Sequence, residues 1–482
     1  MANIAGYWAV GDSKRSVFSS QASALGTSHY WLRCGLDVLE DIWRNTGPDL
    51  GTIQSKIIFM FCIFHMDVLS LKGRNLLSSA ITDARNIGLH MTDASRSTVR
   101  ETTQAEIIDA ELRRRVCWHL VSTDWSAALL VGPCNGVYTV HPNHLHVRKP
   151  RNIMEEDLST KPADFERPED ELTSTTYYLS RITLANICRE VADTLLEMET
   201  VPDLSSLSYD RILALDKKFV DLIEGLPGAF RLESDVDTFR HDEANLATSS
   251  VILKQKYFTY LTTEARRCKL HLPYLLRSQQ SAKYNFSRET CLQAARKILR
   301  LQRVLPSEVL DMSCSIKMIC LLHHFYSAII ILVMDLCVNR QAGQDDRARK
   351  TEIISACKIV EGAKETSTAA SHFLESVGTI LRKHKVRLYD EEEPQAIGNV
   401  CYEPESRPAA DDTTANHVPQ LSVELSPPQL CMGNGHDQHH TGYDMGMDID
   451  FDAMWQSYLQ FDSGLKWDSS LLTGLDGADF VG

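Results

Sequence analysis

The sequence lacks the short cysteine spacings that protein zinc modules use. It has 13 cysteines, but no two of them form a Cys-x-x-Cys pair, whereas zinc ligands that return to one point are usually only a few residues apart. Most of these cysteines lie in apolar stretches with a helical pattern, which is typical of small buried side chains in a reducing compartment. We therefore expect this chain itself to bind no metal and no cofactor.

Signatures of common enzymes are absent as well. The sequence contains no Gly-x-Ser-x-Gly, no His-Glu-x-x-His, no phosphate-binding Gly-rich loop and no dinucleotide fingerprint. Two His–Asp pairs, His65 with Asp67 and His90 with Asp93, lie near expected helices but have no nucleophile with a supporting motif. We predict no catalytic residue and a protein that is not an enzyme. A helical enzyme with an unfamiliar active site stays open as an alternative.

Positive charge and long apolar runs are scarce. The 50 Lys and Arg residues face 64 Asp and Glu residues, which gives a formal net charge of −14. This balance argues against a basic surface over the whole chain, so any DNA contact should come from a separate basic module or a partner. The most apolar run, 318–335, is interrupted by His323 and His324 and is bounded by Asp335. It predicts a buried helix rather than a membrane span, and no membrane contact is expected.

What the sequence does contain is helical periodicity. Apolar residues recur at helical spacing to about residue 387, with Gly or Pro breaks and no stretch that alternates as a strand does. This pattern predicts an all-α fold with one large multi-helix domain. A helix that carries basic residues early should end at Gly132-Pro133, and an extended segment should follow to Pro150. The other expected helices cover residues 30–45, 52–71, 74–89, 173–199, 209–224, 250–272, 288–304, 314–338 and 349–387.

Individual residues suggest where some helices end. We expect Pro273 to close the helix over 250–272, because proline lacks the amide that a helix needs. Ser287 is a good N-cap for the helix that starts at residue 288, since its hydroxyl can bond a free amide of the first turn. Gly378 is a weak point in the helical stretch 349–387.

Composition divides the chain into four parts. Residues 1–28 are polar and show no clear period, so we expect a loose N-terminus, followed by a helical domain over 29–387. The segment 388–440 is rich in proline and poor in bulky apolar residues, which predicts a disordered linker. The histidines at the end of that linker, His436, His439 and His440, lack an ordered scaffold that would favour metal binding.

The last part, 441–482, is acidic and aromatic. From Asp444 onward it has eight aspartates and a single lysine, and aromatic and aliphatic residues are interleaved with them. Self-repulsion keeps such a chain from collapsing, which leaves its aromatic residues free to enter a groove on a partner. This composition is typical of an acidic activation segment. The alternative is a solvated tail that packs Trp455 and Trp467 on the helical domain. Our candidates for coactivator contacts are Trp455, Phe461, Trp467 and Phe480.

The triple-basic run Arg113-Arg114-Arg115 could contact phosphates, but its three side chains point about 100° apart around a helix. Glu111 lies in the same turn, which favours pairing with acids inside the protein.

Several stretches together resemble the regulatory middle region of fungal zinc-cluster transcription factors. They are Ile87-Gly-Leu-His90, then Glu111-Leu-Arg-Arg-Arg-Val-Cys-Trp118, Asp124-Trp125 and Gly132-Pro133, and the extended Val147 to Asn152. Later agreements follow in Asp216 to Pro227, Arg266 to Pro273 and Tyr284 to Ala295. The order and spacing of these pieces are more specific than any one of them. They cover roughly residues 52–304, and the resemblance extends more loosely to about residue 387.

The resemblance implies a nuclear transcription regulator, an activator of a metabolic or biosynthetic pathway, whose helical domain controls the acidic tail. Implied partners are coactivators and a second copy or a zinc-cluster factor as dimer partner, with a small-molecule effector as a further candidate. The six-cysteine zinc cluster of the family does not precede this region, so either an upstream cluster with its zinc is missing from the sequence or DNA contact is indirect. A DNA-binding-deficient module that dimerises with a full-length factor and titrates it stays open. We expect Arg114, Trp118, Asp124 and Trp125 to be structural or interaction determinants.

Overall fold

Helices follow one another along the described part of the chain, as the spacing of apolar residues predicts. The computed structural model describes residues 21–66, 71–94, 103–130, 136–200, 207–232, 246–278, 281–304, 319–339, 344–362, 364 and 368–388. No strand occurs in these ranges, and the expected all-α fold is confirmed. Apart from residue 388, the expected linker and the acidic tail lie outside the described residues. The helices are α2 (Gln21–Asn45), α3 (Leu50–Met66), α4 (Leu71–Asn86), α5 (Gln104–Ala127), α6 (Glu155–Thr160), α7 (Thr176–Thr200), α8 (Leu207–Glu224), α9 (Leu246–Arg277), α10 (Asn285–Val304), α12 (Ile319–Val338), α13 (Gln344–Glu361) and α14 (Thr368–Lys383).

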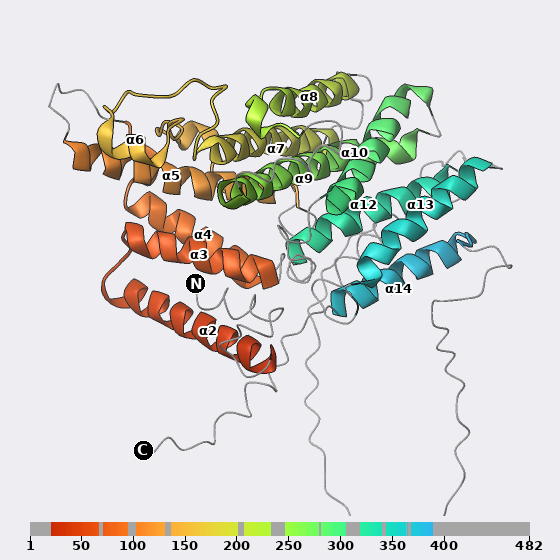
Figure 1. Ribbon diagram of the computed structural model, residues 1–482, viewed down its shortest axis with the longest axis horizontal. Helices are drawn as coiled ribbons and strands as arrows, with labels where there is room; N and C mark the ends of the chain where they lie inside the picture. The colour runs from red at the N-terminus through yellow and green to blue at the C-terminus, as the bar shows by residue number, and fades with distance from the viewer. Residues whose placement is uncertain are drawn as a thin grey trace, which may run out of the picture. The chain divides into compact units, whose positions relative to one another are not determined.

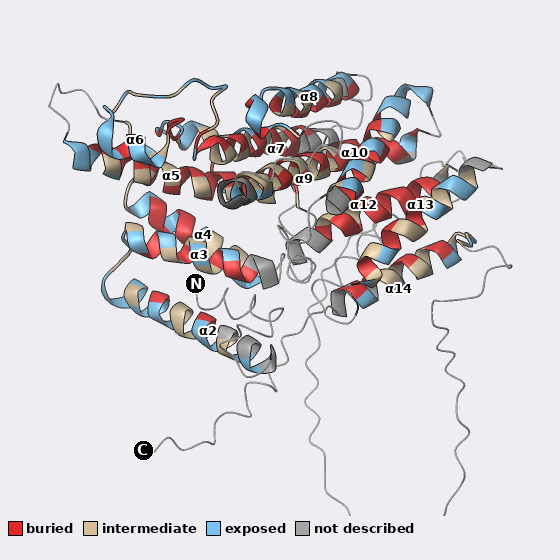
Figure 2. Cartoon of the chain, in the orientation of Figure 1, coloured by how far each residue is buried: buried red, intermediate tan, exposed pale blue. Residues whose placement is uncertain are grey.

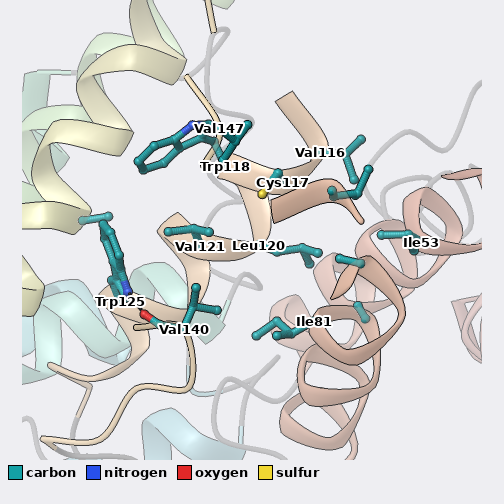
Figure 3. Close-up of a cluster of buried hydrophobic side chains, with 14 of the residues drawn as sticks. Ile53, Ile81, Val116, Cys117, Trp118, Leu120, Val121, Trp125, Val140 and Val147 are labelled. Carbon is teal, nitrogen blue, oxygen red and sulfur yellow. Dashed lines mark hydrogen bonds between the residues drawn. The ribbon is translucent and has the colours of Figure 1, made fainter. Parts of the chain in front are cut away.

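Two clusters of buried apolar side chains hold the first part of this helical region together. The first joins α3, α4, α5 and α7 with a segment that follows α5 (Figure 3). The second joins the end of α5 with α7, α8 and α9. Further along the chain, α9 packs against α10, and α12 packs against α9, α10, α13 and α14 (Figure 1). Because α7 and α9 also contact each other, α5 is connected to α12 through successive helix contacts.

The most apolar run of the sequence forms α12, and it is buried as expected. Ile329 and Val333 have no exposed surface, and buried residues dominate the helix in Figure 2. Its one acid, Asp335, accepts hydrogen bonds from Arg288 on α10 and Arg349 on α13. No helix among the described residues is long and apolar enough to cross a bilayer.

Local chemistry fixes several helix ends around α5. Thr103 and Glu106 form a reciprocal capping box, in which each side chain bonds the other residue's backbone amide. At the end of α4, Gly88 has a φ of 72°, a left-handed conformation that strongly favours glycine. This turn ends α4 and leads into the short 3-10 helix Leu89–Met91, which precedes Asp93.

The structure differs from the expected helix ends in four places. α9 continues through Pro273 to Arg277, because Tyr274 and Leu275 beyond the proline are buried, with 1% and 0% exposure, while the proline itself is exposed. Burial of these side chains offsets the roughly 3 kcal/mol cost of a proline inside a helix. α10 begins at Asn285, so Ser287 lies inside the helix and does not cap it.

The third difference concerns the stretch 349–387, which we expected to be helical with a weak point at Gly378. It forms two helices, α13 and α14, and Gly378 lies within α14. Stacking of Tyr326 on Phe373, with ring centroids 4.1 Å apart, attaches α14 to α12. At the other end, α2 already begins at Gln21, within the stretch 1–28 that we expected to be loose.

Candidate functional site

Four residues singled out in the sequence lie together on α5. Arg114, Trp118, Asp124 and Trp125 are 3%, 9%, 5% and 2% exposed. All four bind backbone or side chains of the residues that surround the helix, and three of them bind the extended segment 136–153. Figure 3 shows Trp118 and Trp125 in the first core cluster, near Val147 and Val140 of that segment.

The last turn of α5 binds the beginning of the extended segment. The Asp124 carboxylate accepts hydrogen bonds from the backbone amides of Thr139 and Val140, both at 2.8 Å from Oδ2. Next to it, Trp125 Nε1 donates to the Val140 carbonyl at 2.8 Å. From α4, Arg85 donates to the Thr139 carbonyl at 3.0 Å. The two peptide groups around Thr139 therefore have partners although they belong to no helix.

The middle of α5 binds the segment near Arg148. Trp118 Nε1 donates to the Arg148 carbonyl at 2.8 Å, and the Arg148 amide donates to Asp93 Oδ2 at 2.8 Å. Asp93 also accepts two hydrogen bonds from Arg114, at 2.6 and 2.9 Å. The Trp118 and Trp125 rings meet edge to face, with centroids 6.0 Å apart, so the two contacts with the segment are packed against each other.

Glu111, one turn nearer the start of α5, is fully buried among three arginines. Its carboxylate accepts from the amide of Arg151 at 3.1 Å and from the Arg151 guanidinium at 3.3 Å. Arg114 and Arg115 of α5 reach the same carboxylate at 3.3 and 3.4 Å. Arg115 also pairs with the exposed Glu155 at 2.8 Å. Arg114 is shared with Asp93, so the buried charges alternate in sign around Glu111.

These contacts define the direction in which the extended segment runs relative to α5. Thr139 is held at Asp124, Arg148 at Trp118 and Arg151 at Glu111, so the segment runs antiparallel to α5. The helix residues involved span about 20 Å at 1.5 Å of rise per residue. Side chains of α5, together with Arg85 and Asp93, thus satisfy backbone groups of a segment that is extended except for the short 3-10 turn Pro142–His144, as buried peptide groups require.

Electrostatics in this site depend on which partners each acid has. Burial alone would raise the pKa of Asp93, but the hydrogen bonds from Arg114 and the Arg148 amide outweigh it and lower that pKa to about 2. For Asp124, burial prevails over the amide hydrogen bonds, and its pKa is raised. The side chain of Asp124 therefore serves as an acceptor of hydrogen bonds rather than as one half of an ion pair.

A second buried network joins the later stretches that the sequence singled out. Asp216 on α8 pairs with Arg267 on α9, at 2.8 Å between Oδ2 and Nη2. His271 lies between Asp216 Oδ1 at 2.9 Å and Ser287 Oγ at 2.8 Å, and Ser287 also meets the Tyr209 hydroxyl. Aspartate, histidine and serine in this order resemble a hydrolase relay, but His271 and Ser287 have no exposed surface. They connect α8, α9 and α10.

Sequence reasoning missed these partnerships. It quoted Asp216, His271 and Ser287 in three separate stretches, but spacing along the chain does not predict that their side chains meet. The one available signal was at His271, a polar residue between two leucines in a helix. Glu111 was noted only as a neighbour of the arginines, and its contact with Arg151 was not expected.

The remaining candidates have simpler surroundings. Each arginine of the triple-basic run pairs with an acid inside the protein, Arg113 with Asp109 at 2.6 Å. His90 is near Asp93 in sequence, but the partners of Asp93 are arginines and an amide. Among the described residues, no group of three or more His, Cys, Asp or Glu is placed to hold a metal ion. The tail candidates Trp455, Phe461, Trp467 and Phe480 lie outside the described residues.

Comparison with known proteins defines the class to which this helical region belongs. The chain is 33% identical over 472 residues to the probable transcription factor lepB of Aspergillus flavus. The aligned region covers 96% of this chain and 79% of lepB. It is 28% identical over 339 residues to the agnestins biosynthesis cluster transcription factor AgnL11 of Paecilomyces divaricatus. A third relative, 27% identical over 308 residues, is the Zn(2)-C6 fungal-type transcription factor mpsB of Macrophomina phaseolina.

The chain belongs to the family of fungal transcription factors, and it is not an enzyme. The resemblance seen in the sequence is thereby confirmed. The aligned regions cover 70% and 62% of this chain for AgnL11 and mpsB, but only 47% and 38% of those relatives. No family model matches the chain, and no solved structure matches it.

Proposed function

We propose that this protein acts in the nucleus as a regulator of transcription for a biosynthetic or other metabolic pathway. The observation that carries the proposal is the 33% identity to a probable transcription factor over 96% of this chain. A second relative is named for a biosynthesis cluster, which supports the choice of pathway genes as targets. The extensive burial of α5 and its partners supports a regulatory scaffold rather than a DNA-reading surface.

In this proposal the parts of the chain have separate tasks. The helical region holds a fixed core, in which α5 binds the extended segment 136–153. The acidic tail 441–482 contacts coactivators through its aromatic residues. DNA contact is supplied either by a zinc cluster or by a zinc-cluster partner, and dimerisation with a second copy or with such a factor brings the tail to a promoter. The formal net charge of −14 supports this division, because it disfavours DNA binding by the helical region itself.

A fusion to a heterologous DNA-binding domain tests the proposal. The full chain, the chain without 441–482 and the tail alone are fused to that domain in a yeast reporter strain. We expect the full chain and the tail to activate the reporter, and the truncated chain to lose most of the activation at equal protein level. Absence of activation by both the full chain and the tail would contradict the activator function.

Gene deletion in the source fungus tests the choice of target genes. Loss of the protein should lower transcripts of a set of clustered biosynthetic genes, and re-expression should restore them. If deletion instead raises the transcripts and overexpression lowers them, the protein titrates a full-length factor. That outcome would favour the DNA-binding-deficient module over the activator.

A further inference from the structure

Helix α2 presents several large apolar side chains to solvent. Tyr30, Trp31, Val38 and Trp43 are 62%, 53%, 58% and 63% exposed, and no other helix among the described residues has more than two such side chains. Single exposed apolar residues are normal on a protein surface, whereas a cluster of them marks an interaction site. The concentration of exposed aromatic surface on one helix therefore points to a partner.

Packing within the chain uses only one face of α2. Among the described helices, α3 is the one that packs extensively against it (Figure 1). The ring of Phe59 on α3 fills the space beside Gly35, where a Cβ would lie 2.0 Å from the ring. Leu32 and Leu39, one turn before and after that glycine, are buried, and Figure 2 shows few other buried positions on α2. The rest of the helix surface is open to a partner.

The exposed apolar residues form a stripe on another face of the helix. Trp31, Cys34 and Val38 are three and four residues apart, so they follow one side of α2, and Tyr30 lies at the edge of that side. At 100° per residue, this stripe is about 120° around the helix from the buried face. The Tyr30 and Trp31 rings meet edge to face, with centroids 6.0 Å apart, and Cys34 is partly exposed. We call these four residues the α2 stripe.

The area of the α2 stripe matches the apolar centre of a standard interface. Because an aromatic side chain buries about 150–250 Å², the exposed parts of Tyr30 and Trp31 together offer roughly 200–300 Å². Val38 and Cys34 bring the stripe to about 400 Å², within the range of functional surface patches. Each partner of a standard interface buries about 800 Å², of which a little over half is apolar. The stripe alone can therefore supply most of the apolar area of one partner.

The charge along α2 fits a second copy of the same helix. Residues 21–36 contain Arg33 and no acid, whereas residues 37–45 contain Asp37, Glu40 and Asp41 against Arg44. The formal charge is thus +1 in the first half and one minus three, or −2, in the second. Two antiparallel copies place each acidic half beside the basic half of the other, and their helix dipoles attract as well. The acidic tail would instead meet like charge on the second half.

We propose that two copies of this chain pair through the α2 stripe, antiparallel and with Cys34 next to the two-fold axis. In a symmetric dimer both copies use the same patch, so the residue at its centre meets its own counterpart. Cys34 is that residue, between Trp31 and Val38. An antiparallel pair about Cys34 brings Trp31 of one copy to Val38 of the other, and removal of these side chains from water drives association.

Self-association is separable from what the dimer does at a promoter. That role rests on the proposed function, in which dimerisation brings the acidic tail to DNA, whereas pairing through the α2 stripe does not. The test therefore uses the purified full chain without DNA or a reporter. A monomeric chain would overturn this inference and leave the reporter test of activation standing, and inactive reporters would leave the dimer standing.

Sedimentation equilibrium of the full chain measures the association. We expect the mass to rise with concentration from one chain, 54.3 kDa, to two chains, with a Kd of about micromolar order. Trp31→Ser should raise Kd at least about thirtyfold, because it removes a central aromatic anchor. Trp43→Ser is the matched control, since Trp43 is as exposed but lies about 120° around the helix from Trp31; it should change Kd less than about threefold.

Circular dichroism checks that both variants keep their helical content. A full chain that stays monomeric at about 100 μM, well above the expected Kd, would overturn the proposal. Equal effects of Trp31→Ser and Trp43→Ser on Kd would overturn the assignment of the stripe.

Chemical cross-linking locates the two-fold axis. Apart from Cys34, the described cysteines other than those in the core are none, since all seven of the rest are buried. A short bismaleimide, which joins two thiols without oxidation, should give a covalent dimer of the full chain. Cys34→Ser should abolish this dimer, and Trp31→Ser should strongly reduce it at the same concentration. An undiminished covalent dimer in Cys34→Ser would overturn the position of the axis.

A peptide of residues 441–482 tests the competing occupant of the stripe. Added in excess to the full chain, it should leave the dimer mass unchanged, because like charge on the second half of α2 disfavours its binding. Dissociation of the dimer by the peptide would assign the stripe to the acidic tail and overturn the proposal.

Discussion

Arg151 contacts Glu111 twice, once with its backbone amide at 3.1 Å and once with its guanidinium at 3.3 Å. The two residues are 40 positions apart, and they connect the first half of α5 with the end of the extended segment. Glu111 has no exposed surface, and its carboxylate pairs with the buried Arg151, whereas Arg114 and Arg115 have further acid partners in Asp93 and Glu155. The contact therefore does two things: it holds the end of the extended segment on α5, and it balances the buried charge of Arg151.

Replacement of Glu111 should be strongly destabilising. Glu111→Gln keeps the shape but removes the negative charge opposite Arg114, Arg115 and Arg151. Breaking a buried ion pair by removal of one partner costs about 3–5 kcal/mol, and urea unfolding of the purified chain measures it. Glu155→Gln is the matched control, since Glu155 pairs with Arg115 but is 58% exposed; it should cost less than about 1 kcal/mol. Equal effects of the two substitutions would refute the assigned role of Glu111.

The two tryptophans of α5 should contribute through their indole N–H groups as well as their volume. In Trp125→Phe the Val140 carbonyl loses its partner and a small cavity forms, which together cost about 2 kcal/mol or more. Trp118→Phe should cost less, because Trp118 is more exposed. Trp43→Phe on α2, where the side chain is 63% exposed, should change the free energy of unfolding by less than about 0.5 kcal/mol. A loss in Trp43→Phe as large as that in Trp125→Phe would contradict this ranking.

Asp124 should tolerate loss of charge but not loss of its oxygens. Its pKa is raised by burial, so ionisation of the folded protein opposes folding as pH rises above the usual pKa of an aspartate. Asp124→Asn retains an oxygen that can accept from the Thr139 and Val140 amides, and we expect a change within about 1 kcal/mol. Asp124→Ala leaves both amides unsatisfied, at a cost of about 1–3 kcal/mol each. Denaturant unfolding at pH 7 checks both, and a loss for the asparagine as large as that for the alanine would show that the charge itself is needed.

The Asp216 carboxylate should make the folding stability of the protein fall as the pH is lowered. Burial would raise its pKa, but the hydrogen bonds from Arg267 and His271 prevail and lower it to about 2. A lowered folded-state pKa means that the stabilisation is complete above the unfolded value, near 4, and is lost as pH falls from there to about 2. Over this pH range the loss amounts to about 2 kcal/mol in the free energy of unfolding.

The measurement is the free energy of unfolding between pH 5 and pH 2.5. Asp216→Asn should lower stability at pH 5 and flatten its dependence on pH. Asp221→Asn, on the same helix and paired with Lys217 on the surface at 52% exposure, should leave the acid dependence close to that of the unchanged protein. An identical slope in both variants would contradict the role of the buried network.

Comparison of particular residues shows how far the sequence could predict this structure. Helices over most of the expected stretches are confirmed, because apolar spacing reports directly on the face that a helix buries. The ends were less predictable. Pro273 and Ser287 carry strong local preferences to stop or cap a helix, but burial of Tyr274 and the contact of Ser287 with His271 decide their positions, and both depend on other helices.

The same limit applies to the candidate site. The grouping of Trp118, Asp124 and Trp125 on one helix follows from their spacing, but their partners Arg148, Thr139 and Val140 do not. Those partners are backbone groups, and a backbone group leaves no mark in the sequence. The roles of the four α5 residues in regulation stay predictions.

The aromatic residues of the acidic tail should be necessary for activation, beyond the negative charge alone. Replacement of Trp455, Phe461, Trp467 and Phe480 by alanine leaves the eight aspartates after residue 443 and Lys466 in place. If the aromatic side chains enter a groove on a coactivator, the fourfold variant should lose at least about 90% of reporter activation by the tail fusion, since aromatic anchors dominate the binding energy of such contacts.

The matched control keeps the aromatic residues and changes other apolar side chains. Alanine at Leu465, Leu471 and Leu472 removes apolar surface without loss of an aromatic ring or of charge. We expect a reduction of activation by about threefold or less, because leucines are seldom the dominant anchors of an interface. Protein levels are compared by immunoblot, so that degradation is not mistaken for loss of function. If the fourfold variant activates as well as the unchanged tail, contact through these aromatic residues is ruled out.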